Sequence, residues 1–315
     1  MRIGILQAAQ LNRNAMPHWR CTVTIAGGAL VFLVVAGNAQ ALADTAKVSE
    51  LMAFVKDLTA TPSDTDQQRV LDTVRKQALK VAGELGETSF IKSILHAMAL
   101  EKEAGTLNEE QFHLYRMVFI QTIPAFDKRA AALVLAQSME GRDEFIRQEA
   151  GEQLEFLLEE NSSLLRDIVK DTTEPPRGLI AFLFTRSGPM SEILMNLLAE
   201  QFVSKADDQK RLTSANGQVA AFSKPHADQS IRETKRAETI AALKPLATDE
   251  RWWVRLYVAC TLQRNSQLYD ADLVGGLSKD PDAAVHRVAN ELRASRALPE
   301  LQIQYPAAKR PSRER

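Results

Sequence analysis

Cysteine is scarce in this 315-residue chain, which contains only Cys21 and Cys260. Cys21 lies in an N-terminal segment that we expect to be removed, so Cys260 would be alone in the mature protein. A single cysteine excludes an intramolecular disulfide, and the stability of the mature chain must therefore come from packing. Because Cys260 lies within an apolar helical segment, we expect a small buried side chain, with an intermolecular disulfide as the alternative.

Two further absences concern β-structure and net charge. No run of alternating Val, Ile and Thr residues stands between turns, and the 14 glycines lie mostly where helices would end. The chain has 39 basic and 40 acidic residues, and removal of the leader arginines Arg2, Arg13 and Arg20 leaves a net charge of about −4. This balance argues against general nucleic-acid binding, which requires a basic surface.

Motifs for cofactor or metal chemistry are missing as well. The sequence contains neither a glycine-rich phosphate loop nor a Gly-x-Ser-x-Gly elbow. Glu110 and His113 have the Glu-x-x-His spacing of a di-iron site, but such a site needs a second pair and two more glutamates. We therefore expect no cofactor and no metal.

The first 43 residues have the organisation of a secretory leader. They are basic at the start, contain no acidic residue, and include the apolar run "CTVTIAGGALVFLVVAG". Ala41-Leu42-Ala43 before Asp44 matches an Ala-x-Ala cleavage site, with cleavage after Ala41 as the second choice. These features predict a periplasmic or secreted protein without a membrane span after cleavage. The alternative is an uncleaved membrane anchor.

The mature chain is predicted to be all-α, without a sheet. In "SELMAFVKDL" the apolar residues Leu51, Phe54, Val55 and Leu58 line one face of a helix, and similar segments follow, separated by short turns. Short turns favour antiparallel neighbours. We expect four regions after the leader: a helical array at 44–205, a polar linker, long loop or frayed helix at 206–228, helix pairs at 229–298, and a basic tail at 299–315. The tail is expected to be solvated, with binding to anionic lipid or cell-wall polymer as the alternative.

An internal repeat is visible in the C-terminal region. Four pairs of similar residues recur at a separation of 31: Leu246 and Leu277, Asp249 and Asp280, Val254 and Val285, Val258 and Ala289. The segments "LATDERWWVRLYVACTL" and "LSKDPDAAVHRVANEL" resemble HEAT repeats over about residues 231–295. The resemblance implies an α-solenoid of stacked helix pairs.

The HEAT resemblance also implies a role for particular side chains. The arginine of the Val-Arg-x-x-Ala pattern meets an acidic side chain at the joint between units, a role that falls to Arg255. His286 occupies that place in the second unit, which departs from the pattern. A weaker match to the Val-Arg-x-x-Ala pattern lies upstream in "DEFIRQEAGEQL", where Arg147 takes the position of the arginine.

The adjacent tryptophans Trp252 and Trp253 raise the question of a binding surface. At about 100° per residue, Trp252 and Trp253 fall on different sides of a helix that is apolar nearly all round. Such a helix is ordinarily enclosed between layers, which favours a structural role for both rings. Trp252 is the alternative exposed anchor, because tryptophan is common at binding hot spots. The candidate binding residues are Trp252, Trp253 and Arg255.

These patterns lead to two functional hypotheses. The first is an exported helical repeat protein that binds another protein or an envelope polymer. The second rests on "GETSF", which resembles the glutamate-serine motif of lytic transglycosylases, all-α enzymes that cleave peptidoglycan. That resemblance would make Glu87 the catalytic acid/base, although Thr88-Ser89 departs from the motif and the Gly-Leu-Met-Gln segment is missing.

Overall fold

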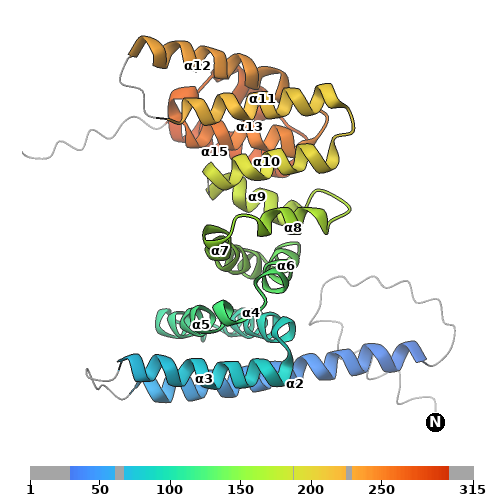
Figure 1. Ribbon diagram of the computed structural model, residues 1–315, viewed down its shortest axis with the longest axis vertical. Helices are drawn as coiled ribbons and strands as arrows, with labels where there is room; N and C mark the ends of the chain where they lie inside the picture. Colours follow the sequence, from blue (N-terminus) through green and yellow to red (C-terminus); the bar gives the residue numbers. More distant parts are fainter. Residues whose placement is uncertain (1–28, 61–66, 187, 225–228, 298–315) are drawn as a thin grey trace, which may run out of the picture. The chain divides into compact units, whose positions relative to one another are not determined.

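The computed structural model describes residues 29–60, 67–186, 188–224 and 229–297, and every regular element within these ranges is helical (Figure 1). The all-α prediction is therefore confirmed for the described residues. Residues 1–28 of the expected leader and the expected basic tail at 299–315 lie outside them. Of the helices described, none has the combination of length and apolar character that a membrane crossing requires.

The chain divides into two compact units, residues 1–43 and residues 44–315. Helix α2, Ala29–Thr59, runs through the boundary. The described part of the first unit is the beginning of this helix. All other described elements belong to the second unit.

The helices follow one another with short connections. The first group comprises α3 Gln67–Leu85, α4 Glu87–Glu103, α5 Glu109–Thr122, α6 Lys128–Met139, α7 Glu144–Glu160, α8 Leu164–Lys170, α9 Arg177–Arg186 and α10 Gly188–Phe202. The second group comprises α11 Ala206–Phe222, α12 Gln229–Leu243, α13 Trp252–Arg264, α14 Ala271–Leu277 and α15 Ala283–Ala297. Three 3-10 turns lie at η1 Ile123–Ala125, η2 Lys244–Leu246 and η3 Ser266–Leu268.

Local side-chain chemistry explains where several helices begin. Asn108 and Gln111 form a reciprocal capping box at the start of α5, with bonds of 2.9 and 3.1 Å. Asp127, Asp143 and Asp270 accept backbone N–H groups at the starts of α6, α7 and α14. Each cap satisfies N–H groups that have no partner within the helix.

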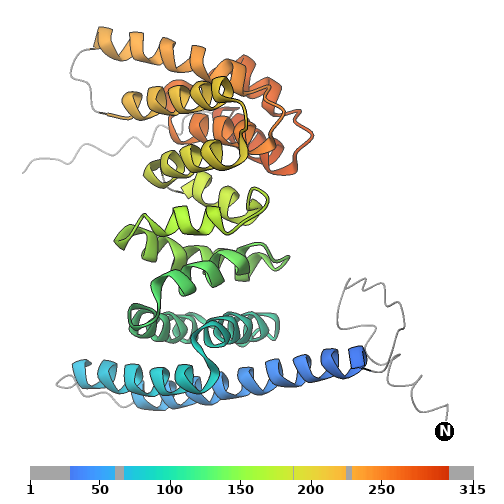
Figure 2. The same ribbon diagram turned by 45° about the vertical axis from the view of Figure 1, so that its right-hand side comes forward.

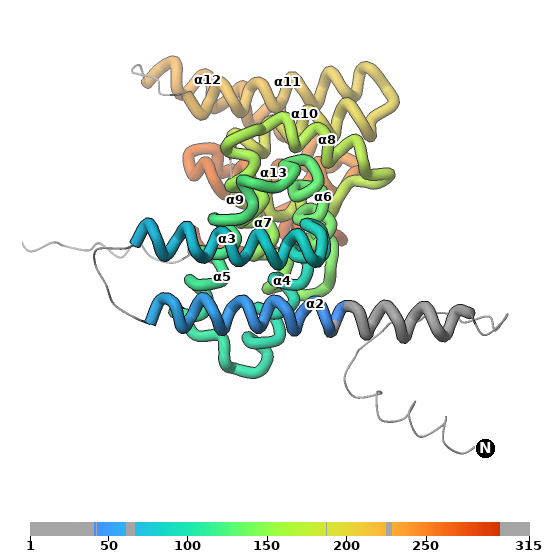
Figure 3. The backbone as a smooth tube through the Cα atoms, turned by 60° about the horizontal axis from the view of Figure 1, so that its bottom comes forward, coloured from blue at the N-terminus to red at the C-terminus, as the bar shows by residue number. Residues whose placement is uncertain are grey.

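Within residues 44–315, the packing joins helices that are near one another in sequence. Pairs in contact include α6 with α7, α10 with α11, α11 with α12, and α13 with α15. In Figure 2 the helices from α6 to α12 follow one another in colour order, and the contacts of α13 with α9 and α10 bring the orange-red helices back beside the yellow ones. The part of α2 beyond residue 44 lies beside α3 in Figure 3, and Lys47 pairs there with Glu84 at 3.1 Å. Buried apolar side chains from successive helices form one cluster.

Two glycines allow unusually close contact between helices. A Cβ atom at Gly178, in the first turn of α9, would lie 2.0 Å from the carbonyl oxygen of Met139 at the end of α6. A Cβ atom at Gly151 in α7 would lie 2.6 Å from the ring of Phe182 in α9. The absence of a side chain at these positions lets α9 approach both neighbours.

Of the alternatives expected for residues 206–228, the linker or long loop is wrong for most of the segment, and the structure shows a helix there. Residues 206–222 form α11, and its apolar face buries Leu212, Ala215, Val219 and Phe222. This stripe is short and partly alanine, so the polar composition of the segment obscured it. Residues 225–228 lie outside the described residues.

A buried polar contact also holds α11 in place. Asn216 donates hydrogen bonds of 2.8 Å to the carbonyl oxygen of Glu192 and 2.9 Å to Oδ1 of Asn196, both in α10. Its own Oδ1 accepts a 2.6 Å bond from the hydroxyl of Tyr257 in α13. A polar residue that looks like a loop signal in the sequence therefore joins three helices.

Candidate functional site

Helix α13 carries the residues expected to form a binding surface, and other helices surround it. It contacts α9 and α10 as well as α14 and α15. Nine of its side chains are buried, from Trp253 to Leu262 with the exception of Arg255. Contacts on several sides explain why the sequence of this helix is apolar nearly all round. Trp253, 2 % exposed, is part of the core.

Each guanidinium nitrogen of Arg255 donates hydrogen bonds to other residues of the chain. Its Nε and Nη2 donate to the two carboxylate oxygens of Asp280 at 2.6 and 3.0 Å. Its Nη1 donates to the carbonyl oxygens of Asp249 and Glu250 at 2.7 and 3.0 Å. The hydrogen bond to Asp280 raises the pKa of Arg255. Because all three guanidinium nitrogens are occupied, this residue joins the turns before α13 and α15.

The 31-residue internal correspondence extends to hydrogen bonds. The N–H of Asp249 donates to Leu246 at 3.2 Å, and the N–H of Asp280 donates to Leu277 at 3.1 Å. Each aspartate then accepts, through Oδ1, the N–H of the residue two places later, at 3.0 and 2.8 Å. The turns before α13 and α15 are therefore built in the same way.

Each of these aspartates also receives an arginine from an earlier helix. Arg211 of α11 binds Asp249 at 2.8 Å, and Arg255 of α13 binds Asp280. Burial by itself would raise the pKa of Asp249, but hydrogen bonds from Arg251 and the charges of Arg251 and Arg211 outweigh it, so the pKa is lowered. The two Arg–Asp contacts tie consecutive segments together.

Arg147 repeats part of this arrangement in α7. Its Nη1 donates to the carbonyl oxygens of Gly141 and Arg142 at 3.0 and 2.8 Å. These acceptors lie six and five residues earlier in the chain, the same offsets as the two carbonyl acceptors of Arg255. Arg147 and Arg255 therefore share the offsets of their carbonyl acceptors.

Trp252 is half-buried and is covered on one face by a cation. The guanidinium of Arg177, at the start of α9, lies 4.3 Å from the centroid of its ring. Arg177 also pairs with Asp282 and remains 55 % exposed. Trp252 is thus neither enclosed like Trp253 nor freely exposed, and the contact connects α9, α13 and the turn before α15.

A hollow of about 410 Å³ adjoins this contact through Arg177. It is lined by apolar and small residues together with the cationic side chains of Arg147, Arg177 and Arg287. The carboxylate of the lining, on Glu140, accepts the backbone N–H groups of Gly178 and Leu179 at 3.0 and 3.3 Å. The lining of the hollow beside this contact therefore combines three arginines and one glutamate with apolar and small residues.

Sequence reasoning did not identify Arg177 or Arg287 as members of this surface. Arg177 stands 75 residues before Trp252, and no local pattern marks that it will reach the ring. Arg287 lies in α15, and its ion pair with Glu291 on the same helix is long, at 4.0 Å. Only the packing of α9 and α15 around α13 brings these side chains to one hollow.

The two chemical motifs singled out in the sequence have ordinary helical surroundings. Glu87 lies in the first turn of α4, and its Oε2 accepts the backbone N–H of Asp127 at 3.1 Å. His113 lies 3.9 Å from Glu109 on the surface of α5. No group of three or more potential metal ligands occurs in the part of the chain that the structure describes.

The most deeply buried glutamate of the described ranges is held by neighbouring side chains. Glu149 is 2 % exposed and accepts 2.8 Å hydrogen bonds from Arg116 and Gln153. A buried carboxylate with such partners joins α5 to α7, since both its charge and its hydrogen-bonding capacity are used within the protein.

Comparison with known proteins gives no relative: no family model matches this chain, and no curated protein matches it.

Proposed function

We propose that this protein is an exported HEAT-like α-solenoid that binds another protein or an envelope polymer on the surface beside Trp252. The observation that carries the proposal is the combination of Trp252, the exposed guanidinium of Arg177 and the adjoining basic hollow. Tryptophan and arginine are among the residue types most enriched at binding hot spots.

The hydrogen-bond correspondence between the two C-terminal turns supports the repeat assignment. A helical repeat protein offers side chains from several units on one surface, which suits an extended partner. The residues of the hollow come from the end of α6 and from α7, α9 and α15. Its three arginines favour a partner with acidic groups at the contact.

The leader-like composition of residues 1–43 supports export. Mass spectrometry of the protein recovered from its native envelope is expected to find Asp44 or Leu42 at the N-terminus. Recovery of an intact leader would instead indicate an anchor.

Site-specific photo-crosslinking tests the binding surface. Trp252→p-benzoylphenylalanine should yield a defined crosslinked product in native envelopes, whereas the same substitution at Phe156, an aromatic residue 40 % exposed on α7, should not. In the Trp252 variant, Arg287→Gln should reduce the product, and Arg293→Gln, on the same helix outside the hollow, should leave it unchanged. Equal products at both crosslinking positions, or equal effects of the two arginine changes, would contradict the proposal.

A further inference from the structure

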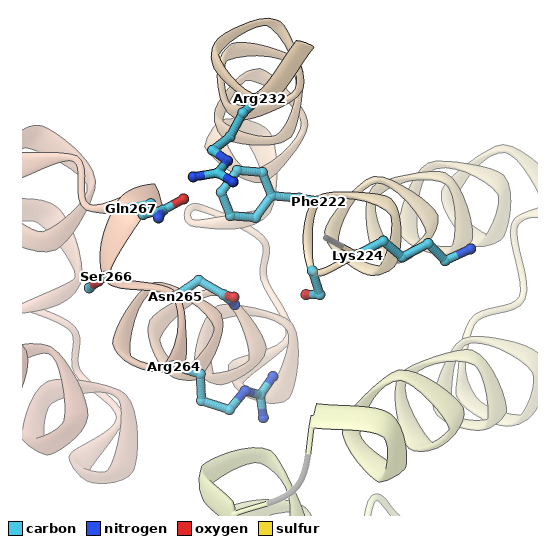
Figure 4. Close-up of a pocket in the computed structure, with 8 residues that line it drawn as sticks. Phe222, Lys224, Arg232, Arg264, Asn265, Ser266 and Gln267 are labelled. Carbon is cyan, nitrogen blue, oxygen red and sulfur yellow. The ribbon is translucent and has the colours of Figure 1, made fainter. Parts of the chain in front are cut away.

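A second cavity lies where the ends of α11 and α13 approach α12 (Figure 4). Its volume is about 310 Å³. In this view Arg232 of α12 lies above Asn265 and Arg264, at the end of α13, lies below it, while Lys224 extends outward to the side. Ser223 also lines the cavity. Gln267 completes the polar lining. Among the residues that the structure describes, the lining includes three cations and no carboxylate.

Arg264 is distinguished by the nature of its partners. Its Nη1 donates to the carbonyl oxygen of Phe184 and, at 2.6 Å, to the hydroxyl of Ser191. Both acceptors are neutral, and no carboxylate among the described residues forms an ion pair or hydrogen bond with Arg264. By contrast, Arg211, Arg251 and Arg255 each bind an aspartate.

Burial of the Arg264 guanidinium without a directly bonded carboxylate carries an electrostatic cost. Burial lowers the pKa of Arg264, which means that the charged form is less well solvated here than in water. Glu192 interacts electrostatically with Arg264 and Lys224, but it does not line the cavity. Among the described residues, three cations therefore line the cavity, and Glu192 acts on two of them from outside the lining.

We propose that this cavity binds a phosphate-class oxyanion, a site that is separate from the surface beside Trp252 and goes beyond the proposed function. Guanidinium groups donate paired hydrogen bonds to such oxyanions, and a lysine at the rim adds a mobile positive charge. The amide of Gln267 and the second amide N–H of Asn265, whose first donates to the carbonyl oxygen of Thr261, supply further donors. A tetrahedral phosphate has more acceptor oxygens than a carboxylate and matches donors that converge from several elements.

The test is titration of the purified full-length protein with inorganic phosphate at constant ionic strength, followed by calorimetry. Saturable binding is expected in the wild type. The double substitution Lys224→Gln and Arg232→Gln should weaken it about tenfold or more, because two charge-assisted contacts are lost. A matched double, Lys210→Gln and Lys235→Gln, removes the same charge from α11 and α12 outside the cavity and should leave the affinity within about twofold.

Two single substitutions test the contribution of individual charges to phosphate binding. Glu192→Gln should tighten phosphate binding, since it removes the competing negative charge. Arg264→Gln should weaken binding and also lower the melting temperature, because Arg264 anchors α13 to Phe184 and Ser191. Glu192→Gln and the double substitution of Lys224 and Arg232 therefore test phosphate binding without removing the hydrogen bonds that anchor α13.

The source of the phosphate group is distinguished by two further probes. Glycerol 3-phosphate represents a soluble phosphomonoester, and vesicles containing phosphatidylglycerol represent a lipid headgroup. Binding of either probe that the Lys224 and Arg232 changes weaken supports the site and identifies its source. The proposal is overturned if phosphate does not saturate, if both double variants bind equally, or if acetate binds as tightly as phosphate.

Discussion

Trp252 and Trp253 are adjacent in the chain but occupy different environments. Trp253 is 2 % exposed in the core, whereas Trp252 is half-buried beneath Arg177. Trp253→Ala should therefore lower the free energy of unfolding by about 3 to 5 kcal/mol, through lost burial and a cavity. Trp252→Ala should cost less than half as much, since it loses partial burial and a cation–π contact of about 1 kcal/mol. Denaturant unfolding of both variants measures the difference, and equal losses would contradict it.

Val285 tests the register of the internal repeat. Its side chain is fully buried in α15, whereas Glu291 on the same helix is exposed and lies 4.0 Å from Arg287. Val285→Asp would bury a carboxylate without a partner and should destabilise the protein by about 3 kcal/mol or more. Glu291→Ala should change stability by about 0.5 kcal/mol or less. Thermal melts compare the two, and similar melting temperatures would contradict the burial of Val285 at the position that the 31-residue correspondence gives it.

At the scale of elements, the approach of α9 to α6 depends on one missing side chain. A Cβ atom at Gly178 would lie 2.0 Å from the backbone carbonyl of Met139, so Gly178→Ala must push the two helices apart. We expect a loss of about 2 kcal/mol or more, as for other overpacked positions. The measurement is again the free energy of unfolding.

Gly217 provides the control for this substitution. It lies within α11, and a Cβ atom there would meet nothing within 4 Å. Gly217→Ala should stabilise the protein by up to about 1 kcal/mol, because alanine restricts the unfolded chain and favours the helix. Opposite signs at the two positions are expected. A loss of stability at Gly217 as large as at Gly178 would mean that the contact with Met139 is not the cause.

For the whole molecule, buried acids predict a loss of stability at alkaline pH. Burial raises the pKa of the Cys260 thiol to about 12, and burial also raises the pKa values of Tyr115 and Tyr257 above their ordinary range. The unfolded chain releases these protons at lower pH than the folded chain does. Stability from these groups is therefore complete below about pH 8 and decreases as the pH rises towards the folded-state values.

Denaturant unfolding between about pH 8 and about pH 11 measures this dependence. Cys260→Ala is the matched variant, because it removes one of these three buried acids. Its stability should decrease less over this interval than that of the wild type. Identical slopes would show that the thiol does not contribute.

The all-helical class and several helix starts follow from sequence alone. Asn108, Asp127 and Asp143 cap their helices through bonds to backbone groups two or three residues away. Such interactions are local, and the apolar spacing of a helix repeats within four residues. The 31-residue correspondence was also readable, since Asp249 and Asp280 each form the turn that precedes a helix.

Tertiary structure decided the rest, because contacts between distant segments leave no local pattern. Within helix α11, the polar side chain of Asn216 can be buried because neighbouring helices satisfy its hydrogen bonds. The enclosure of Trp253, the covering of Trp252 by Arg177 and the neutral partners of Arg264 each depend on residues far away in the chain. Sequence determined which segments form helices through short-range hydrogen bonds and periodicity, whereas packing determined which charges and rings face solvent.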